Sequence, residues 1–220
     1  MISVKNLIKT FVDGDKVTPV LKGVDFECES GEFIAIMGRS GAGKSTFMYQ
    51  VSLLDEPTSG EIIIEGLNAH DMTADEKTNF RLTELGYVFQ DYALLPDLTA
   101  KENVALPLLM QGMSKKKAYE ISAISLKKAG LDHRMDFLPS QLSGGEQQRV
   151  SITRAVAHKP KILFADEPTA NLDNYSSGLV MEMFKELHRE GQTIIMVTHE
   201  EQYAKLAERI IHFDDGKIVS

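Results

Sequence analysis

Residues 38–45 read Gly-Arg-Ser-Gly-Ala-Gly-Lys-Ser, and these residue types suit the holding of a phosphate group. The octet fits the pattern G-x-x-x-x-G-K-[ST], in which glycines let the backbone wrap closely around a phosphate with its N–H groups pointing inward. Lys44 would reach the β and γ phosphates of a nucleotide, and the Ser45 hydroxyl would hold Mg²⁺. The expected nucleotide contacts along this stretch are Gly38, Arg39, Ser40, Gly41, Ala42, Gly43, Lys44, Ser45 and Thr46.

A short apolar run precedes the octet, and a segment that can open a helix follows it. Residues 33–37, bounded by Gly31 and Gly38, predict a buried strand. Residues 46–51 can form the first turns of a helix, whose N-terminus adds partial positive charge beside the loop. The alternative, a glycine-rich turn that only joins a strand to a helix, is disfavoured because both flanks match the pattern.

Two adjacent carboxylates, Asp166 and Glu167, follow the apolar run 161–165. Ligands in open α/β sheets bind at the carboxyl ends of the strands, which is where this pair would lie. We expect Asp166 to hold Mg²⁺, directly or through water, and Glu167 to polarise the water that attacks the γ-phosphate. An acidic turn after a core strand is the alternative, but the preceding phosphate loop favours the catalytic interpretation.

Residues 142–146, Leu-Ser-Gly-Gly-Glu, predict the start of another helix. Ser143 and Glu146 can form a capping box, which does not require two glycines at the first helical positions. Gly144 and Gly145 supply bare N–H groups at a positive helix end. Residues 143–146 therefore form a second candidate phosphate-binding surface. The spacing leaves open whether both surfaces bind one nucleotide within a chain or whether two chains share nucleotides.

The composition limits the kinds of protein to consider. The 220 residues carry a formal net charge of -8, which argues against a nucleic-acid backbone as the main partner. The single cysteine, Cys28, allows no internal disulfide, and its alternating surroundings are typical of a packed strand residue. The N-terminus shows no signal-peptide pattern and no apolar run is long enough to span a bilayer, so we expect a cytoplasmic chain.

Strands alternate with helices along much of the chain, which predicts an α/β fold with a parallel sheet. Besides residues 33–37, the strand candidates are 2–11, 17–29, 61–65, 86–90, 161–166, 193–198 and 209–213. Helix starts are predicted by capping boxes that pair Thr73 with Glu76, Thr99 with Glu102, and Thr198 with Glu201. Residues 91 to about 150 are mostly helical and predict a lobe inserted into the fold.

The order of these motifs resembles that of the ATP-binding subunits of ABC transporters over essentially the whole chain. Residues 38–45 resemble the Walker A loop, 142–146 the family signature, and 162–167 the Walker B strand with its catalytic glutamate. Gln90, which follows the stretch 86–89, resembles the Q-loop glutamine. The resemblance implies that Gln90 touches Mg²⁺ and reports to a membrane domain.

Other residues receive a role only through this resemblance. His199 resembles the switch histidine that contacts the γ-phosphate, and Asp173 ends a stretch similar to the D-loop. Phe11 stands where the family has an aromatic ring that stacks on adenine, and Val17 is assigned to the same site. Each has an ordinary alternative: Phe11 and Val17 as packing residues, Asp173 as a helix cap, Gln90 as a polar strand end, and His199 as a first-turn helix residue.

The resemblance also implies a fold, the ABC ATPase fold. It consists of an α/β P-loop NTPase core with a parallel sheet, an N-terminal antiparallel β subdomain and an inserted α-helical lobe. One domain is expected to span residues 1–220. Its RecA-like core with the β subdomain would comprise 1–90 and 151–220, and its lobe 91–150.

Cofactors and partners follow from the same resemblance. ATP and Mg²⁺ are the expected cofactors, and a homodimer is expected in the ATP state. The two chains would pair head to tail, with each ATP between one chain's Walker A loop and the other chain's signature. A separate integral membrane permease would hold the chain at the inner face of the cell membrane, and no nucleic-acid partner is expected. Its docking site is expected near residues 90–110, because Tyr92, Leu94, Leu95 and the run 104–110 carry more apolar area than a free surface should. The alternative for these residues is ordinary helix packing in the lobe.

Three segments, 54–60, 88–92 and 167–173, resemble the lipoprotein-release, macrolide-export and cell-division group within the family. The expected function is ATP hydrolysis that powers a membrane subunit through ATP-driven dimerisation. The alternative is a non-transport ABC ATPase that transmits force or a signal through a membrane partner, since both use the same ATPase.

Two residues depart from the family pattern. Glu146 stands where the family usually has glutamine. The change adds negative charge near a bound triphosphate but completes the capping box, and we expect function to be retained. Arg39 stands in the Walker A loop where a small residue or proline is more usual, and nothing in the sequence explains it.

Overall fold

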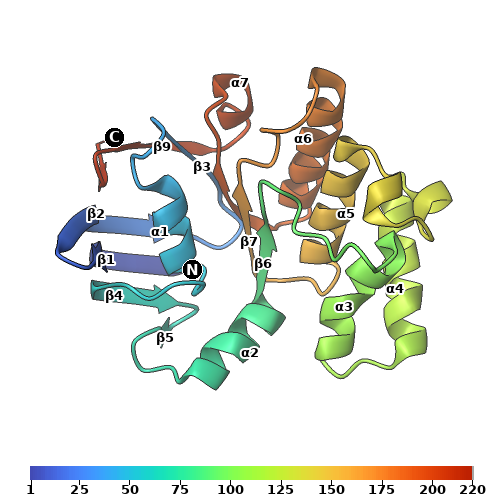
Figure 1. The fold of residues 1–220 in the computed structure, drawn as a ribbon, viewed down its shortest axis with the longest axis horizontal. Coiled ribbons are helices and arrows are strands. Elements are labelled where there is room, and N and C mark those ends of the chain that lie inside the picture. The colour runs from blue at the N-terminus through green and yellow to red at the C-terminus, as the bar shows by residue number, and fades with distance from the viewer. Residues whose placement is uncertain (220) are drawn as a thin grey trace.

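The computed structural model describes residues 1–219. Their strands form two sheets (Figure 1). The first sheet is antiparallel and has the order β2-β1-β4-β5. Its strands are β1 (Ile2–Asp13), β2 (Lys16–Cys28), β4 (Ser59–Ile64) and β5 (Leu67–Asn68). This sheet is the antiparallel β subdomain that the resemblance implies, and β5 is an additional strand that was not predicted.

The second sheet has the order β10-β9-β3-β8-β7-β6. Its strands are β3 (Phe33–Gly38), β6 (Leu85–Val88), β7 (Ile162–Asp166), β8 (Thr193–Val197), β9 (Arg209–Asp214) and β10 (Lys217–Ile218). The strands from β9 to β6 are parallel, and β10 pairs with β9 in the antiparallel sense. Every residue of β7 and β8 is buried, as parallel strands covered on both faces require. The predicted parallel sheet is therefore confirmed.

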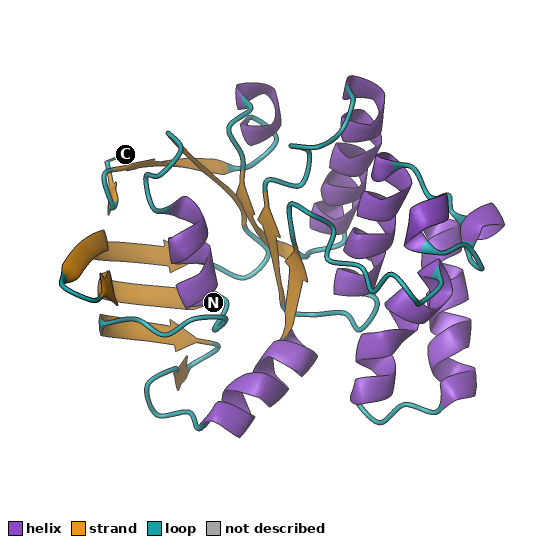
Figure 2. Ribbon diagram, in the orientation of Figure 1, coloured by secondary structure: helices purple, strands orange, loops and turns teal. Residues whose placement is uncertain are grey.

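Helices gather beside the parallel sheet, and several form a lobe on the side away from the antiparallel sheet (Figure 2). The helices are α1 (Lys44–Val51), α2 (Ala74–Glu84), α3 (Ala100–Met110), α4 (Lys115–Lys128), α5 (Gly144–Val156), α6 (Asn174–Arg189) and α7 (Glu201–Ala204). Two 3-10 turns, η1 (Asp132–Arg134) and η2 (Pro139–Gln141), separate α4 from α5. The expected lobe boundary at residue 150 falls within α5, and the division into core and lobe stays a prediction. Within residues 1–219, no helix has the length and apolar character needed to cross a bilayer.

Aromatic packing fixes α1, and with it the loop that precedes α1, between the two sheets. The Phe47 ring of α1 lies 5.2 Å from the Phe26 ring of β2, centroid to centroid, and 5.2 Å from the Phe213 ring of β9. All three side chains are at least 96% buried. Burial of a side chain of this size stabilises the fold by about 1.5–3 kcal/mol. The opposite face of the parallel sheet is covered by α5 and α6, whose Ile152 and Phe184 belong to a second core cluster.

Cys28 is the last residue of β2 and is fully buried in the core cluster that also contains Phe26, Phe47 and Phe213. Burial raises the pKa of its thiol to about 12, and the neighbouring Glu32 carboxylate adds to the rise. A thiol with so high a pKa is unreactive at neutral pH. Cys28 therefore packs passively, as expected from its surroundings in the sequence.

Two of the three predicted capping boxes next to helices α2, α3 and α7 form. Thr73 and Thr99 each accept a hydrogen bond from the backbone N–H of the glutamate three residues on, and that glutamate bonds back to the threonine N–H. The box predicted between Thr198 and Glu201 is wrong. The Thr198 hydroxyl instead accepts from the N–H of Glu200 at 3.1 Å, a shorter turn, so α7 begins at Glu201 without a side-chain cap.

Candidate active site

Four neighbouring strands of the parallel sheet bring the candidate site residues to one edge. β3 pairs with β8, β8 with β7, and β7 with β6, all in the parallel sense. Because parallel strands end at the same edge, the loops that follow them lie next to one another. The phosphate loop follows β3, and the segments with His199, Glu167 and Gln90 follow β8, β7 and β6.

The phosphate loop ends in Gly43, the N-cap residue of α1. Its φ is 101°, a left-handed conformation that glycine adopts without steric cost. Lys44 is only 7% exposed, and its Nζ donates to the carbonyl oxygens of Gly38 at 2.9 Å and Arg39 at 3.0 Å. These contacts hold a buried positive charge across the loop at the N-terminus of α1. The arrangement suits a polyphosphate, because the charge and the backbone N–H groups attract an anion at one place.

The other residues predicted to contact the nucleotide along this stretch differ in exposure. Arg39, Ser40 and Gly41 are exposed, Ala42 is buried, and Thr46 is half-buried. Nothing in the structure explains the arginine at position 39.

A buried carboxylate meets a hydroxyl directly beside this loop. The Ser45 hydroxyl donates to Oδ1 of Asp166 at 3.2 Å, and Asp166 is only 6% exposed. Burial raises the pKa of the Asp166 carboxyl; the bond from Ser45 and the charge of Lys44 oppose this rise, and the charge of Glu167 adds to it. A carboxylate and a hydroxyl oxygen at the edge of a phosphate site are ligands that Mg²⁺ accepts together with phosphate oxygens. The residues present therefore fit this ion.

Glu167 and His199 lie together beyond the ends of β7 and β8. Nδ1 of His199 is 3.4 Å from Oε2 of Glu167, and both side chains reach solvent. Glu167 has a φ of 46°, which is uncommon for a residue with a side chain, and its N–H donates to the Val197 carbonyl at 3.0 Å. The turn holds the Glu167 carboxylate beside His199, at the carboxyl end of β8. Strain of this kind is common in catalytic sites.

Gln90 lies just beyond β6, the next strand along this edge, and its side chain is exposed. Its backbone carbonyl accepts a hydrogen bond from Nδ2 of Asn171 at 3.1 Å. The loop after β6 is thus tied to the segment that follows Glu167.

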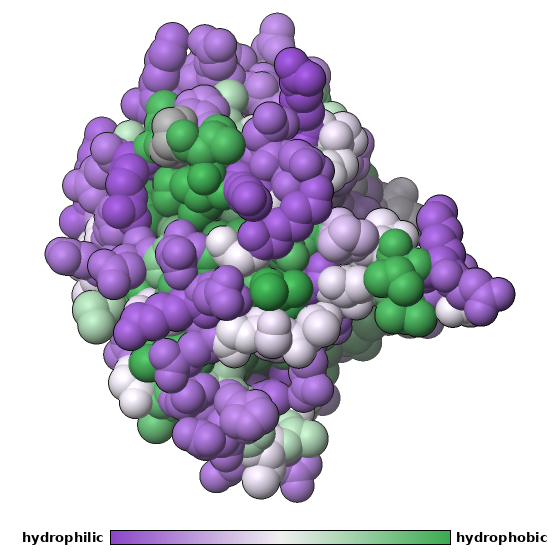
Figure 3. Space-filling view, turned by 90° about the vertical axis from the view of Figure 1, so that its left-hand side faces the viewer, coloured by the Kyte–Doolittle hydropathy of each residue, from purple (hydrophilic) through white to green (hydrophobic). Residues whose placement is uncertain are grey.

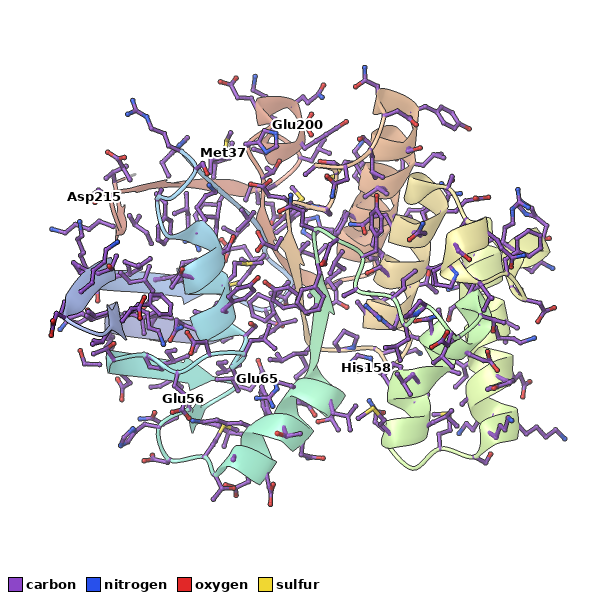
Figure 4. The ribbon with its side chains drawn as sticks, in the orientation of Figure 1. Met37, Glu56, Glu65, His158, Glu200 and Asp215 are labelled. Carbon is purple, nitrogen blue, oxygen red and sulfur yellow. The ribbon has the colours of Figure 1, made fainter. Side chains whose placement is uncertain are left out.

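The opposite edge of the sheet carries none of the predicted site residues. Figure 4 labels Glu200, beyond the carboxyl end of β8, and His158, which precedes β7 at the other end. A groove of about 950 Å³ opens at that other end and is lined in part by His158 and Gln192. This groove is not the candidate site, although it is large, because the phosphate loop and the two carboxylates lie at the other edge of the sheet, where the parallel strands end.

The second phosphate-binding candidate forms the N-terminus of α5. The Ser143 hydroxyl accepts from the Glu146 N–H at 3.3 Å, and Oε2 of Glu146 accepts from the Ser143 N–H at 2.8 Å. Arg134, which the sequence analysis missed, donates through Nε to Oε1 of Glu146 at 2.8 Å. Burial raises the pKa of Glu146, but the hydrogen bonds from Ser143 and Arg134 outweigh it and bring the pKa below its usual value. The added negative charge is therefore compensated within the chain.

Close packing explains why the signature contains a glycine at position 145. A Cβ on Gly145 would lie 2.5 Å from Oγ of Ser176 in the first turn of α6. Asp173 is the N-cap of α6, where its Oδ1 accepts from the Ser176 N–H at 2.8 Å. The helix-cap role considered for Asp173 is thus present, and it places the residue next to the first turn of α5.

Within one chain the two phosphate-binding candidates are far apart. Figure 1 shows α1 and α5 on opposite sides of β6 and β7. Within residues 1–219, no hydrogen bond or ion pair joins residues 143–145 to the phosphate loop. The interpretation in which both surfaces bind one nucleotide inside a single chain is therefore not supported.

Phe11 and Val17 lie on the hairpin formed by β1 and β2. Phe11 pairs with Thr18 and Val12 with Val17 across the strands. Phe11 is 46% exposed and Val17 is 63% exposed, so neither packs beneath the sheet. Nζ of Lys9 lies 4.9 Å from the centre of the Phe11 ring. Figure 3 views the molecule from this side and shows hydrophobic patches among mostly hydrophilic residues.

Gln148 is a second residue that the sequence analysis missed. It shares the buried face of α5 with Gly145, Ile152 and Ala155, yet it is polar. Its Nε2 donates to the carbonyl of Pro168, directly after Glu167, at 2.8 Å. A polar residue within an apolar stripe at helical spacing is the signal that could have found it.

Together, the parallel sheet, the phosphate loop after β3 and the carboxylates after β7 define a nucleoside triphosphatase of the P-loop class. Comparison with protein families identifies the family within that class. The model for the family described as "ABC transporter" matches residues 21–170. The chain belongs to this family, as its resemblance predicted.

Relatives and solved structures agree. The chain is 45% identical to the macrolide export ATP-binding/permease protein MacB of Campylobacter fetus, over 100% of this chain and 34% of that protein. It thus spans about a third of the MacB relatives. It is also 45% identical to an uncharacterized ABC transporter ATP-binding protein of Methanocaldococcus jannaschii, covering 98% of that protein.

The fold is that of a solved ATP-binding cassette. A dimeric structure of the cassette MJ0796, in a post-hydrolysis state bound to ADP and Pi, has a TM-score of 0.94 and 40% identity. The match covers 100% of this chain and 97% of that one. The expected ABC ATPase fold is therefore confirmed.

Proposed function

We propose that this chain binds and hydrolyses ATP, with Mg²⁺, and that it powers a membrane permease as the ATP-binding subunit of a transporter. The single observation that carries the proposal is the group of side chains at one sheet edge. A buried Lys44 lies beside the bonded pair of Ser45 and Asp166, and Glu167 contacts His199. The name of MacB, a macrolide export ATP-binding/permease protein, supports the transport role.

Each residue has a defined task in this proposal. Lys44 and the loop N–H groups bind the β and γ phosphates, and Ser45, Asp166 and Gln90 hold Mg²⁺. The ion supplies charge neutralisation on the phosphates when it is bound. Glu167 accepts a proton from the attacking water, and His199 orients Glu167 through the 3.4 Å contact and reaches the γ-phosphate.

The nucleotide site needs a second chain. Ser143, Gly144, Gly145 and Glu146 form a phosphate-binding helix tip that does not reach the phosphate loop of its own chain. We therefore assign this tip to the ATP held by a partner copy in a head-to-tail homodimer. The dimeric state of the related cassette MJ0796 supports the assignment. Asp173, at the start of α6 beside the tip, would face the same interface.

Phe11 and Val17 complete the proposed nucleotide site. The Phe11 ring is exposed on the hairpin next to α1 and offers one face for adenine stacking, while Lys9 covers part of the ring. Val17 is exposed on the opposite strand of the same hairpin and adds apolar area.

The permease is proposed to dock on residues 90–110 and to hold the chain at the inner face of the membrane. Leu95 and Met110 in this segment are 44% and 63% exposed, more than large apolar side chains usually are. The core, residues 1–90 and 151–220, would bind ATP, and the lobe, 91–150, would carry the signature and the docking surface. Transmission of force or a signal through a membrane partner remains the alternative function, and it would use the same ATPase.

The Glu167→Gln variant tests the proposal. Without the carboxylate that accepts the proton, turnover should fall by about a hundredfold or more, while ATP still binds. The trapped ATP should hold two chains together, so light scattering with saturating ATP and Mg²⁺ should show a dimer. A variant that stays monomeric under these conditions would refute the shared site. Unchanged turnover would refute the role of Glu167.

A further inference from the structure

Gln148 lies in the middle of α5 and is fully buried. Its Nε2 donates to the Pro168 carbonyl at 2.8 Å, whereas its Oε1 finds no partner within residues 1–219. A buried acceptor without a partner destabilises a fold, so an apolar residue would suit this position better for stability alone. What the glutamine adds is the bond to Pro168.

That bond reaches the turn that carries the proposed catalytic base. Pro168 follows Glu167, whose φ of 46° persists only if the surrounding structure holds it. The Glu167 N–H is bonded to the Val197 carbonyl at 3.0 Å, which fixes the turn on its β8 side. Proline has no N–H group, so its carbonyl is the only backbone atom through which it can form a hydrogen bond. Gln148 fixes the turn from the α5 side through this carbonyl.

The same helix begins at the signature tip. Ser143 is the N-cap of α5, and Gln148 lies five residues further along, about 7.5 Å at 1.5 Å per helical residue. Gly145 lies so close to α6 that an added Cβ would be 2.5 Å from Oγ of Ser176. The tip, Gln148 and the start of α6 are thus packed as one unit. A displacement of the tip moves the Gln148 amide with it.

We propose that Gln148 is a positioning residue that couples the two ATP sites of the dimer. Contact of the signature tip with ATP in one site sets, through Gln148 and Pro168 of the same chain, the position of Glu167 in the other site. This inference rests on the proposed head-to-tail dimer. It predicts that Gln148 acts in cis, on the Glu167 of its own chain, and not in trans on the ATP that its tip touches.

The first test separates positioning from nucleotide binding. Gln148→Met keeps the side-chain length and removes the donor. Its kcat should fall about tenfold, while KM for ATP and the midpoint of ATP titration stay within twofold of the wild type. The matched control is Gln192→Met. Gln192 donates through Nε2 to the Lys161 carbonyl at 3.1 Å, the same kind of bond at the other end of β7, and kcat should stay within twofold. A rise in KM with unchanged kcat would overturn the proposal.

The second test distinguishes cis from trans action. A limiting amount of an active chain is mixed, before ATP is added, with an excess of a silent Glu167→Gln chain, so that each active chain pairs mainly with a silent one. The quantity measured is the rate of the first ATP hydrolysis per active chain, because ATP trapped on the silent chain keeps the mixed dimer closed afterwards. The reference is the wild-type chain with this silent partner. In one arm the active chain carries Gln148→Met, and this rate should fall about tenfold. In the other arm only the silent chain carries it, and the rate should stay within twofold of the reference.

The possible results have separate meanings. Loss in the second arm alone, or equal loss in both arms, would place the effect at the tip and the shared ATP and would overturn cis coupling. Capture of an affinity-tagged wild-type chain that recovers no silent chain in the presence of ATP would show that no mixed dimer forms. In that case the proposed head-to-tail dimer fails, whereas the first test still reports whether Gln148 positions Glu167 within a chain.

Discussion

The N-termini of α1 and α5 are the two candidate phosphate-binding surfaces, and they differ in how their backbone N–H groups are satisfied. Helix α1 has Gly43 as its N-cap residue, with no side-chain cap and no acidic residue in its first turn. α5 starts at Ser143 with a reciprocal capping box to Glu146, and that glutamate is paired with Arg134. The α1 end thus has no side-chain cap, whereas the capping box at the α5 end satisfies the N–H groups of Ser143 and Glu146 and leaves those of Gly144 and Gly145.

The difference indicates an order of events. The α1 end offers a buried lysine and uncapped N–H groups, so we expect it to bind a polyphosphate more tightly than the α5 end does. The α5 end is stable without a ligand and offers mainly the Ser143 hydroxyl and the N–H groups of Gly144 and Gly145. In the proposed function, binding to α1 would therefore supply most of the nucleotide affinity, and contact with α5 would supply the response to a γ-phosphate that is already held.

Lys44→Ala is the strongest way to break this comparison. Removal of a cation that is 7% exposed and lies across the loop should weaken ATP binding about thirtyfold or more, equivalent to about 2 kcal/mol. Titration of a fluorescent ATP analogue measures the change. Ser143→Ala is the comparison at the α5 end and should leave monomer affinity within about threefold. Equal losses in both variants would show that the two ends do not differ in the way described.

Gly145→Ala tests the α5 end by steric means. The new Cβ would lie 2.5 Å from Oγ of Ser176, so α5 and α6 must separate. Overpacking of this kind destabilises by about 1–3 kcal/mol, which chemical unfolding can measure, and ATP-driven dimerisation should weaken with it. Gly178→Ala in α6 is the matched control, because a Cβ there meets nothing within 4 Å and should stabilise by about 0.4–1 kcal/mol. If the two alanine variants are equally stable, the close contact has no energetic consequence.

Local sequence signals predicted most of the fold and much of the site. The phosphate loop, the Ser143 cap and the strand that ends at Asp166 are each encoded within a few neighbouring residues. The contacts of Glu146 with Arg134 and of Gln148 with Pro168 join residues 12 and 20 positions apart, and they depend on how η1 and β7 pack against α5. No local pattern specifies such contacts.

The wrong capping box shows the same limit on a smaller scale. Thr198 has the right spacing to Glu201, but its hydroxyl bonds to the N–H of Glu200, and Oε1 of Glu200 in turn accepts from Oγ1 of Thr169 at 2.9 Å. A residue 31 positions away therefore helps to decide which turn forms. Spacing alone could not weigh a tertiary hydrogen bond against a local cap.

Glu146→Gln gives the smallest expected effect and sharpens the comparison through pH. The variant keeps the capping geometry but loses the ion pair with Arg134, so it should destabilise by less than about 1 kcal/mol at neutral pH. Because the folded pKa of Glu146 lies below its unfolded value, its charge stabilises the fold above the unfolded pKa, about 4.5. That stabilisation is lost as the pH falls through the lower folded pKa. Urea unfolding of both proteins between about pH 7 and pH 3 should show their difference shrinking toward acid.

A double-mutant cycle with Arg134→Gln assigns the effect to the ion pair. If the pair is responsible, Glu146→Gln should cost little in the Arg134→Gln background, and the coupling should disappear at acid pH. A pH-independent difference, or one that persists without Arg134, would show that the carboxylate acts through the N-terminus of α5 instead. In that case the α5 end would rely on its own charge rather than on Arg134, and its contrast with the uncapped α1 end would be larger than the structure indicates.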